Sequence, residues 1–193
     1  MGAPGTSETP VSDDTLVARV GAGDAFACRE LAERHLGRIV SFAYRMLGNH
    51  ADAEDVAQEV FVRLWTHAAR WHPGGARLTT WLHRVALNLC HDRWARVRER
   101  PMEAAANLPD PRPSPAMMLH ERDIARHVSA ALESLPERQR AAIALCHYQG
   151  LGNIEAAGVM EISVEALESL LARGRRGLRA RLAAIAPHLL GER

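Results

Sequence analysis

Five arginines follow one another at short intervals near the end of the chain, with no acidic residue among them: Arg173, Arg175, Arg176, Arg179 and Arg181. A guanidinium group is suited to phosphate, and a helix with fixed positive charge attracts the backbone of a nucleic-acid duplex. Residues 153–172 have the pattern of a short apolar helix, a three-residue turn and a longer helix, which is typical of a helix-turn-helix. Such motifs also occur in proteins that bind no DNA. The prediction that this C-terminal segment contacts DNA therefore depends on the arginine cluster.

Carboxylates are concentrated in an earlier segment that contains no basic residue: Asp52, Glu54, Asp55 and Glu59. At helical spacing, Gln58 and Val62 fall on the same face as Asp55 and Glu59. A solvated helix face is the more common explanation for such a pattern. The alternative is a docking face for a basic partner protein. Val62 favours it, because an apolar side chain on that face has no role if the face meets only water.

A third set of residues combines an aromatic ring, a cation and an amide on one face of an expected helix: Trp81, Arg84, Asn88 and His91. Tryptophan stacks on unpaired bases, arginine neutralises phosphate, and asparagine pairs with a base edge. The loop before this helix contains His72 and two glycines, and it could close over an extruded base. The competing explanation is that some tryptophans, Trp65 in particular, belong to the core.

Histidine and cysteine pairs give a weaker signal. Cys90–His91 and Cys146–His147 are adjacent pairs whose side chains would point apart on a helix, and no second pair stands at the spacing of zinc ligands. Cys28 makes the cysteine count odd, and there is no Cys-x-x-Cys, so no disulfide framework is expected. Phosphate-binding loops and hydrolase motifs are also absent from the sequence. We therefore expect no metal site, no cofactor and no enzymatic activity.

All of these candidate residues are predicted to lie on helices or in the loops between them, because no stretch of the sequence shows the alternation of apolar and polar residues that marks a strand. Helices are expected over residues 24–47, 52–65, 79–98, 137–148 and 153–160, with one before Pro136 and one from Ser163. The first should begin at the capping residue Asp24 and end at Gly48. The second should bury Val56, Val60, Leu64 and Trp65.

Five prolines between residues 101 and 116 mark a linker between two small domains. The predicted organisation is all-α: a disordered tail over 1–21, a first domain over 22–100, a linker over 101–118 and a second domain over 119–190. The net charge is only +1, and all 24 basic residues are arginines spread over the chain, which we attribute to codon usage. No signal segment and no apolar run of membrane-spanning length is present, so a soluble, cytoplasmic protein without membrane insertion is expected.

Two sets of motifs resemble one known family. Residues 52–61 (Asp-Ala-Glu-Asp-Val-Ala-Gln-Glu-Val-Phe) and 80–88 (Thr-Trp-Leu-His-Arg-Val-Ala-Leu-Asn) resemble domain 2 of the extracytoplasmic-function sigma factors of bacterial RNA polymerase. Residues 135–140 (Leu-Pro-Glu-Arg-Gln-Arg), with the helix-turn-helix, resemble their domain 4. The resemblance covers about residues 22–185 in order. It implies a non-enzymatic subunit that directs promoter-specific transcription initiation by core polymerase.

The resemblance also implies roles for the candidate residues. The acidic face would dock on the clamp coiled coil of the polymerase β′ subunit: Asp52, Asp55, Gln58, Glu59 and Val62. The next helix and its loop would open and recognise the −10 promoter element: His72, Arg77, Trp81, Arg84, Asn88 and His91. The helix-turn-helix would recognise the −35 element near the β flap, with Ser163, Glu165 and Ser169 at base edges and Arg173, Arg175 and Arg176 at phosphates. An anti-sigma factor would cover these surfaces, as part of a stress or environmental response.

The chain departs from the family within the helix-turn-helix. The family has glycine in the turn, where Glu161 stands here, and Glu161 should strain or shift a turn that requires a left-handed conformation. Glu168 and Leu170 stand where the family offers a lysine and an arginine, so the family's −35 preference is not carried over. Three alternatives stay open: a stand-alone helix-turn-helix regulator, a sigma-like decoy that is inactive in initiation, and a metal or redox sensor that uses the cysteines.

Overall fold

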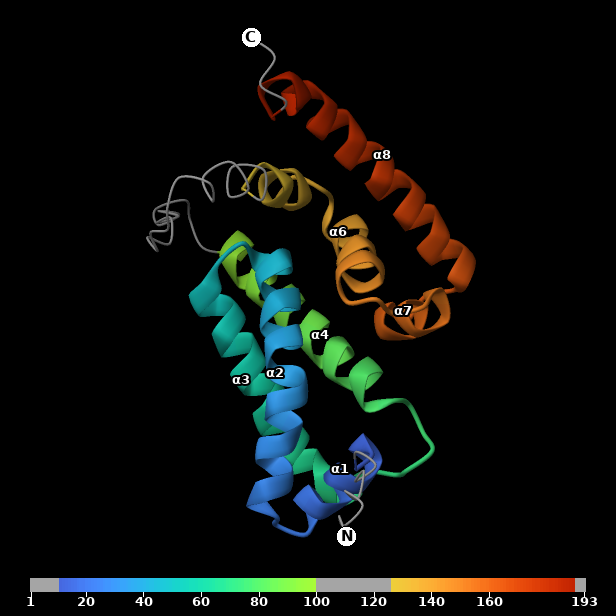
Figure 1. Cartoon of the computed structure of the whole chain (residues 1–193). Helices are drawn as coiled ribbons and strands as arrows, with labels where there is room; N and C mark the ends of the chain where they lie inside the picture. The colour runs from blue at the N-terminus through green and yellow to red at the C-terminus, as the bar shows by residue number, and fades with distance from the viewer. Residues whose placement is uncertain (1–10, 100–125, 190–193) are drawn as a thin grey trace, which may run out of the picture.

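The computed structural model describes residues 11–99 and 126–189, and every regular element within them is a helix (Figure 1). The helices are α1 (Asp13–Gly21), α2 (Ala25–Leu47), α3 (His50–His67), η1 (Ala68–Arg70), α4 (Leu78–Glu99), α6 (Glu137–Ile143), the π-helical turn η2 (Ala144–Tyr148), α7 (Asn153–Met160) and α8 (Val164–Leu189). Residues 126–133 are also helical. The all-α prediction is confirmed. The predicted linker, residues 101–118, lies outside the described residues.

Local capping chemistry sets the ends of the helices that carry the candidate residues. The Asp24 carboxylate accepts hydrogen bonds from the backbone N–H of Phe26 and Ala27, at 2.8 and 3.2 Å, so α2 begins as predicted. Gly48 ends α2 in the left-handed conformation, with φ of 71°. The start of α3 differs from the prediction, because Asn49 rather than Asp52 is the N-cap and accepts a hydrogen bond from the Asp52 N–H at 3.0 Å.

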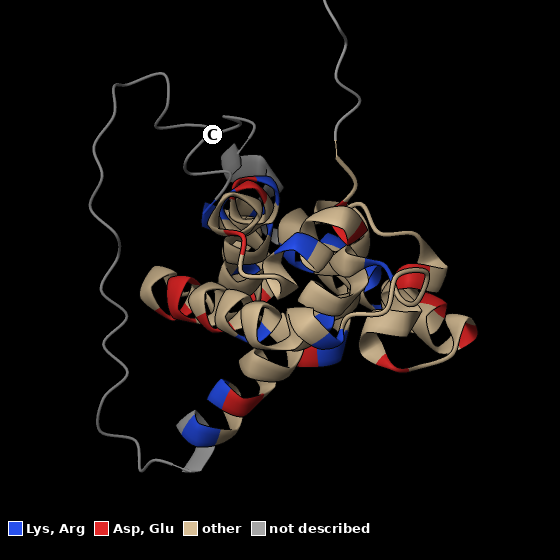
Figure 2. Cartoon of the chain, turned by 90° about the horizontal axis from the view of Figure 1, so that it is seen from below, with Lys and Arg blue, Asp and Glu red and all other residues tan. Residues whose placement is uncertain are grey.

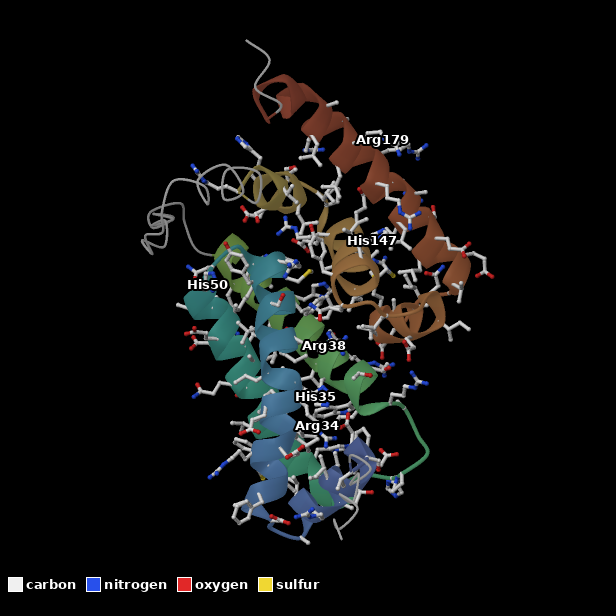
Figure 3. All side chains as sticks on the ribbon, viewed as in Figure 1. Arg34, His35, Arg38, His50, His147 and Arg179 are labelled. Carbon is white, nitrogen blue, oxygen red and sulfur yellow. The ribbon has the colours of Figure 1, made fainter. Side chains whose placement is uncertain are left out.

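Helix α1 lies in the segment that the sequence predicts as part of a disordered tail. Ser12 caps this helix, and Leu16, Val17 and Val20 are buried in the core. Asp13 joins α1 to α2, since its carboxylate oxygens lie 3.1 Å from Arg34 Nη1 and 2.8 Å from His35 Nε2 (Figure 3). For residues 13–21 the expected disorder is therefore wrong, because three apolar residues at helical spacing provide enough burial to fix a two-turn helix.

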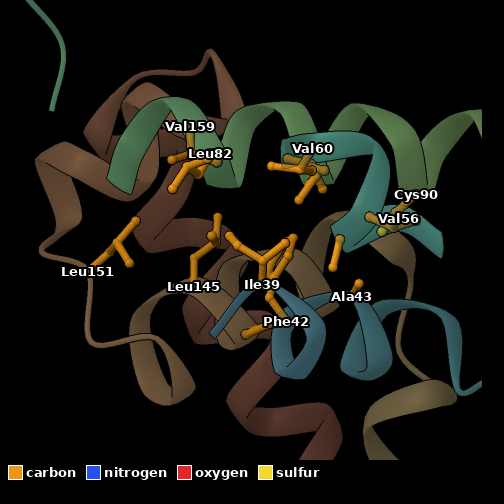
Figure 4. Close-up of a cluster of buried hydrophobic side chains, with 14 of the residues drawn as sticks. Ile39, Phe42, Ala43, Val56, Val60, Leu82, Cys90, Leu145, Leu151 and Val159 are labelled. Carbon is orange, nitrogen blue, oxygen red and sulfur yellow. The ribbon is translucent and has the colours of Figure 1, made fainter. Parts of the chain in front are cut away.

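Helices α2, α3 and α4 lie side by side and enclose the core of the first domain (Figure 1). The buried side chains of this core continue without a break into the second domain (Figure 4). Ile39, Phe42 and Leu82 from the first domain are fully buried together with Leu145 and Val159 from the second. The two domains therefore pack on each other through a common hydrophobic core.

Two glycines allow the arginine-rich helix α8 to lie close to α6 and to the turn that precedes it. A Cβ atom at Gly174 would stand 3.0 Å from Ile143 Cγ1, and one at Gly177 would stand 2.8 Å from Leu135 Cδ2. Both separations are shorter than ordinary van der Waals contacts. Glycine at these positions therefore fixes how the second domain presents its arginines.

Candidate functional site

The acidic face of α3 is exposed, as predicted. Asp52, Asp55, Gln58 and Val62 are exposed and Glu59 is half-buried. Arg93 of α4 is the cation on the neighbouring helix, with its Nε 3.6 Å from Asp52 Oδ1 and its Nη2 3.5 Å from Asp55 Oδ2. Ion pairs at these separations on an exposed surface contribute little free energy, so a partner can displace them at small cost. The carboxylates therefore remain available to a basic partner.

An apolar groove of about 510 Å³ runs beside the acidic face, between α2 and α3. Its lining includes Leu36, Phe61 and Trp65 together with Asp55 and Gln58. Trp65 is 44% exposed, so the expectation that it belongs to the core is wrong: Phe61, at 3% exposed, takes the inward position instead. An apolar groove with a carboxylate edge fits an amphipathic helix with basic residues. Sequence reasoning missed Leu36 and Trp65, although Trp65 stands one helical turn from Val62.

The predicted face of α4 is formed, but its members differ in how far they are accessible. Asn88 and His91 are exposed, and His72 lies exposed in the preceding loop. The Trp81 ring stacks on His67, with centroids 5.4 Å apart and planes 12° apart, and meets the edge of Trp71 at 6.2 Å. One face of the Trp81 ring is therefore already occupied within the first domain.

The two arginines of this set are turned towards the second domain. Arg77 Nη1 lies 2.7 Å from Glu155 Oε1 of α7. Arg84 Nη2 donates a hydrogen bond to the Gly158 carbonyl at 2.6 Å, and its Nη1 lies 3.2 Å from Glu161 Oε1. The structure thus brings the candidate −10 arginines together with carboxylates that the sequence did not connect with them.

The helix-turn-helix has the predicted geometry. Helix α7 ends at Met160 and α8 begins at Val164, so the turn is residues 161–163. Ser163 Oγ caps α8 by accepting a hydrogen bond from the Ala166 N–H at 3.2 Å. Glu161 has φ of 53° and ψ of 47°, the left-handed conformation that a glycine adopts without strain. The turn therefore has its expected length, and Glu161 adopts the strained left-handed conformation within it.

The candidate −35 residues lie from the cap of α8 to the middle of that helix, and most of them are exposed. Ser163, Glu165, Arg173, Arg175 and Arg176 are exposed, and Ser169 is half-buried. Ser169 Oγ accepts a hydrogen bond from Arg173 Nη2 at 2.7 Å. Arg175 Nε lies 3.1 Å from His147 Nε2 on η2 (Figure 3). Seen from below, acidic and basic residues interleave over the helices (Figure 2), which matches the net charge of +1.

The cysteines do not assemble a metal site. Within residues 11–99 and 126–189, no group of three or more His, Cys, Asp or Glu side chains could hold a metal ion. Burial raises the pKa of the Cys90 thiol to about 12 and also raises the pKa of Cys146. Both thiols are therefore protonated at neutral pH and are poor ligands and nucleophiles. Among these described residues, no helix is both long and apolar enough to cross a membrane.

Known families and structures match both domains. Sigma-70 region 2 matches residues 31–100, and sigma-70 region 4 matches residues 126–178. The chain is 31% identical over 180 residues to the RNA polymerase sigma factor NccH of Alcaligenes xylosoxydans xylosoxydans, covering 90% of this chain and 96% of NccH. It is 35% identical over 158 residues to the ECF RNA polymerase sigma factor SigE of Mycolicibacterium smegmatis, covering 80% of this chain and 61% of SigE.

Solved structures agree with this assignment. The structure of CnrH in complex with the cytosolic domain of CnrY is similar with a TM-score of 0.69 and 28% identity, over 89% of this chain and 97% of CnrH. The sigma factor RpoE of Bartonella quintana, solved with the anti-sigma factor NepR, shares the fold with a TM-score of 0.64 and 23% identity, over 80% of this chain and 96% of RpoE. From its two matched regions, their order and these relatives, the chain belongs to the extracytoplasmic-function family of RNA polymerase sigma factors.

Proposed function

We propose that the chain docks on core RNA polymerase through the acidic face of α3 and the apolar groove beside it. The partner surface would be a basic coiled coil, the β′ clamp helices. The observation that carries this proposal is the exposure of Trp65 and Val62, at 44 and 42%, beside carboxylates whose ion pairs with Arg63 and Arg93 lie on the surface. Large exposed apolar residues with charged neighbours are typical of a binding surface.

We assign promoter recognition to two helices. Asn88 and His91 of α4, with His72 and Arg77 of the loop, would contact the −10 element, and Arg84 would neutralise phosphate. Trp81 would support this surface from within the domain, since its ring stacks on His67. Helix α8 would contact the −35 element near the β flap through Ser163, Glu165 and Ser169, with Arg173, Arg175 and Arg176 at phosphates.

The cellular setting is also a proposal. A related sigma factor was solved with an anti-sigma factor, and we propose that this chain too is held by one, in the cytoplasm, until a stress or environmental signal releases it. The first domain, predicted over residues 22–100, would be extended by α1, and the second would cover residues 119–190.

Run-off transcription with bacterial core polymerase on a promoter library from the host tests the proposal. We expect discrete new transcripts that define both promoter elements. Core binding without transcripts would indicate the decoy, and an absence of core binding would support a stand-alone regulator instead.

A further inference from the structure

Glu168 is an acidic side chain on the part of α8 that would enter a major groove. It lies in the second turn of the helix and is exposed, whereas its neighbour Leu167 is fully buried. Residues near the start of a recognition helix are the ones that reach base edges. The arginines that would contact phosphates come later in the helix, from Arg173 onward. Glu168 therefore stands among the positions that contact bases.

A second helix fixes the direction of the Glu168 side chain. Helix α7 packs against α8 (Figure 1), and Asn153, its first residue, donates a hydrogen bond from Nδ2 to Glu168 Oε1 at 3.3 Å. Among the residues that the structure describes, Glu168 Oε2 has no hydrogen-bond partner. Ser169, in contrast, is contacted from its own helix, since its Oγ accepts a hydrogen bond from Arg173. A contact that orients a side chain from another element is what a specific site requires.

The chemistry of a carboxylate restricts the bases that it can contact. An ionised carboxylate only accepts hydrogen bonds. In the major groove, guanine presents two acceptors, and thymine presents one acceptor and a methyl group. Adenine presents a donor beside an acceptor, which suits an amide better than a carboxylate. Cytosine presents the N4 amino group, which is a donor, and is therefore the best match for Glu168.

The negative charge of Glu168 makes this match selective. A carboxylate that enters a groove lined by phosphates is repelled by them. Cytosine opposite Glu168 supplies a donor that offsets this repulsion, whereas guanine or thymine adds a further acceptor. The same side chain therefore favours one base and disfavours others, which is how specificity is obtained.

We propose that Glu168 recognises a cytosine in the −35 element and that Asn153 is the residue that positions it. The inference rests on the proposed function, which places the start of α8 in the groove of that element. It adds a base preference at a position where the chain departs from its family.

The test measures base preference at every position of the −35 element. A host promoter found by run-off transcription is randomised over this element, and the transcripts made by core polymerase with the full chain are sequenced. We expect one position at which cytosine exceeds the other bases roughly tenfold, as one specific base contact would give. At that position alone, E168Q should change the preferred base to adenine and E168R should change it to guanine.

Asn153→Ala tests the positioning role. The carboxylate stays in place, so cytosine should remain the preferred base while discrimination at that position falls roughly threefold, as expected for the loss of one hydrogen bond. A merely structural effect of Asn153 would lower transcription from all templates alike and would remove the positioning role. E33Q is the matched control, because it removes an exposed carboxylate from α2, and it should reproduce the wild-type base profile.

Identical base profiles for wild type, E168Q and E168R would overturn the proposal. A gain spread evenly over all templates in E168Q would also overturn it, because that result indicates relief of phosphate repulsion without base recognition. Selection from a random duplex pool on the immobilised full chain, without polymerase, separates this failure from a failure of the proposed function. If E168Q changes cytosine to adenine there while no variant directs transcription, the base contact stands and the promoter-directing activity does not. No enriched base by either route would overturn both.

Discussion

Arg140 joins the two domains at a position where only 9% of its surface is exposed. Its Nη1 donates to the Met46 carbonyl of α2 at 2.6 Å, and its Nη2 donates to the carbonyls of Glu133 and Leu135. Burial lowers the pKa of this guanidinium group, but arginine titrates so far above neutrality that it stays charged. Its hydrogen bonds therefore offset the free-energy cost of removing a charged guanidinium group from water.

Substituting Arg140 with methionine should lower the free energy of unfolding by about 3 kcal/mol, because several carbonyls lose their donor at once. Urea denaturation followed by circular dichroism measures this change. Arg138→Met is the matched control, since Arg138 is exposed, and it should stay within about 0.5 kcal/mol of wild type. Equal effects of the two substitutions would show that Arg140 is not the tie between the domains.

His83 should make stability depend on pH. Burial lowers the pKa of this imidazole, and the nearby charges of Arg38 and His35 act in the same direction, whereas hydrogen bonds to the Thr79 carbonyl and Gln149 act against them. Near pH 6.5 this imidazole therefore binds a proton in the unfolded chain but stays neutral in the folded chain. The free energy of unfolding consequently falls as the pH drops below about 6.5.

Unfolding free energies measured at several pH values between about 5 and 7 test this. His83→Asn should remove a slope of up to about 1.4 kcal/mol per pH unit below pH 6.5. His91, whose pKa burial also lowers, should leave a smaller slope in the variant. If His83→Asn keeps the wild-type slope, His83 is not the group responsible.

Glu161→Gly should stabilise the chain by about 1 kcal/mol, because glycine adopts the left-handed turn conformation without the cost that a side chain adds. The gain should exceed the loss of one exposed ion pair with Arg84. Thermal unfolding measures the shift. Met160→Gly, at the last residue of α7, is the contrasting change and should destabilise the chain, because it removes a side chain that packs against the core. A lower melting temperature for Glu161→Gly would show that the ion pair outweighs the strain.

At the scale of single helices, sequence patterns predicted most of what the structure shows. The capping residue Asp24, the stop at Gly48 and the turn at residues 161–163 each depend on one local interaction, and all three are confirmed. The observed cap of α3, Asn49, stands three residues before the predicted cap, Asp52, because both residue types are good caps and the local pattern does not choose between them. Periodicity alone does not choose between Phe61 and Trp65 for the inward position, and the structure buries Phe61.

Helix α3 should bind core polymerase through its exposed face. Reversing both charges with D55R/E59R should weaken core binding at least tenfold, because it places arginines against a basic partner. Fluorescence anisotropy with labelled chain measures the affinity. The variant should fold normally, since the ion pairs lost are exposed. E33R/E59R, with one reversal outside the face, should have an intermediate effect, and unchanged affinity for D55R/E59R would remove α3 from the docking surface.

Helix α4 is best tested at Asn88, which is exposed and contributes nothing to the core. Asn88→Ala should reduce promoter opening, measured by permanganate reactivity of unpaired thymines, while core affinity stays within twofold of wild type. Trp81→Ala is a poorer probe, because it also removes the ring that stacks on His67. A loss of core binding in Asn88→Ala, with opening intact, would place this face against the polymerase instead of DNA.

At the scale of the whole molecule, the sequence predicted two helical domains but not their contact. The ties between them join residues far apart in the chain, such as Arg84 with Gly158 and Arg38 with Gln149. A pattern of neighbouring residues cannot predict contacts between residues that lie so far apart in the sequence. The residues of the candidate −10 surface could therefore be predicted, whereas the carboxylates that pair with Arg77 and Arg84 could not.

Helix α1 has a practical consequence for any study of a chain shortened at its N-terminal end. The matched region 2 begins at residue 31, and cutting there would remove Leu16, Val17 and Val20 from the core and the start of α2 with them. The remaining protein would expose apolar surface on α2 and η1 and lose the Asp14 partner of the Trp71 indole. With the second domain kept, a chain that starts at Val11 should be monodisperse in size-exclusion chromatography, and one that starts at Leu31 should aggregate.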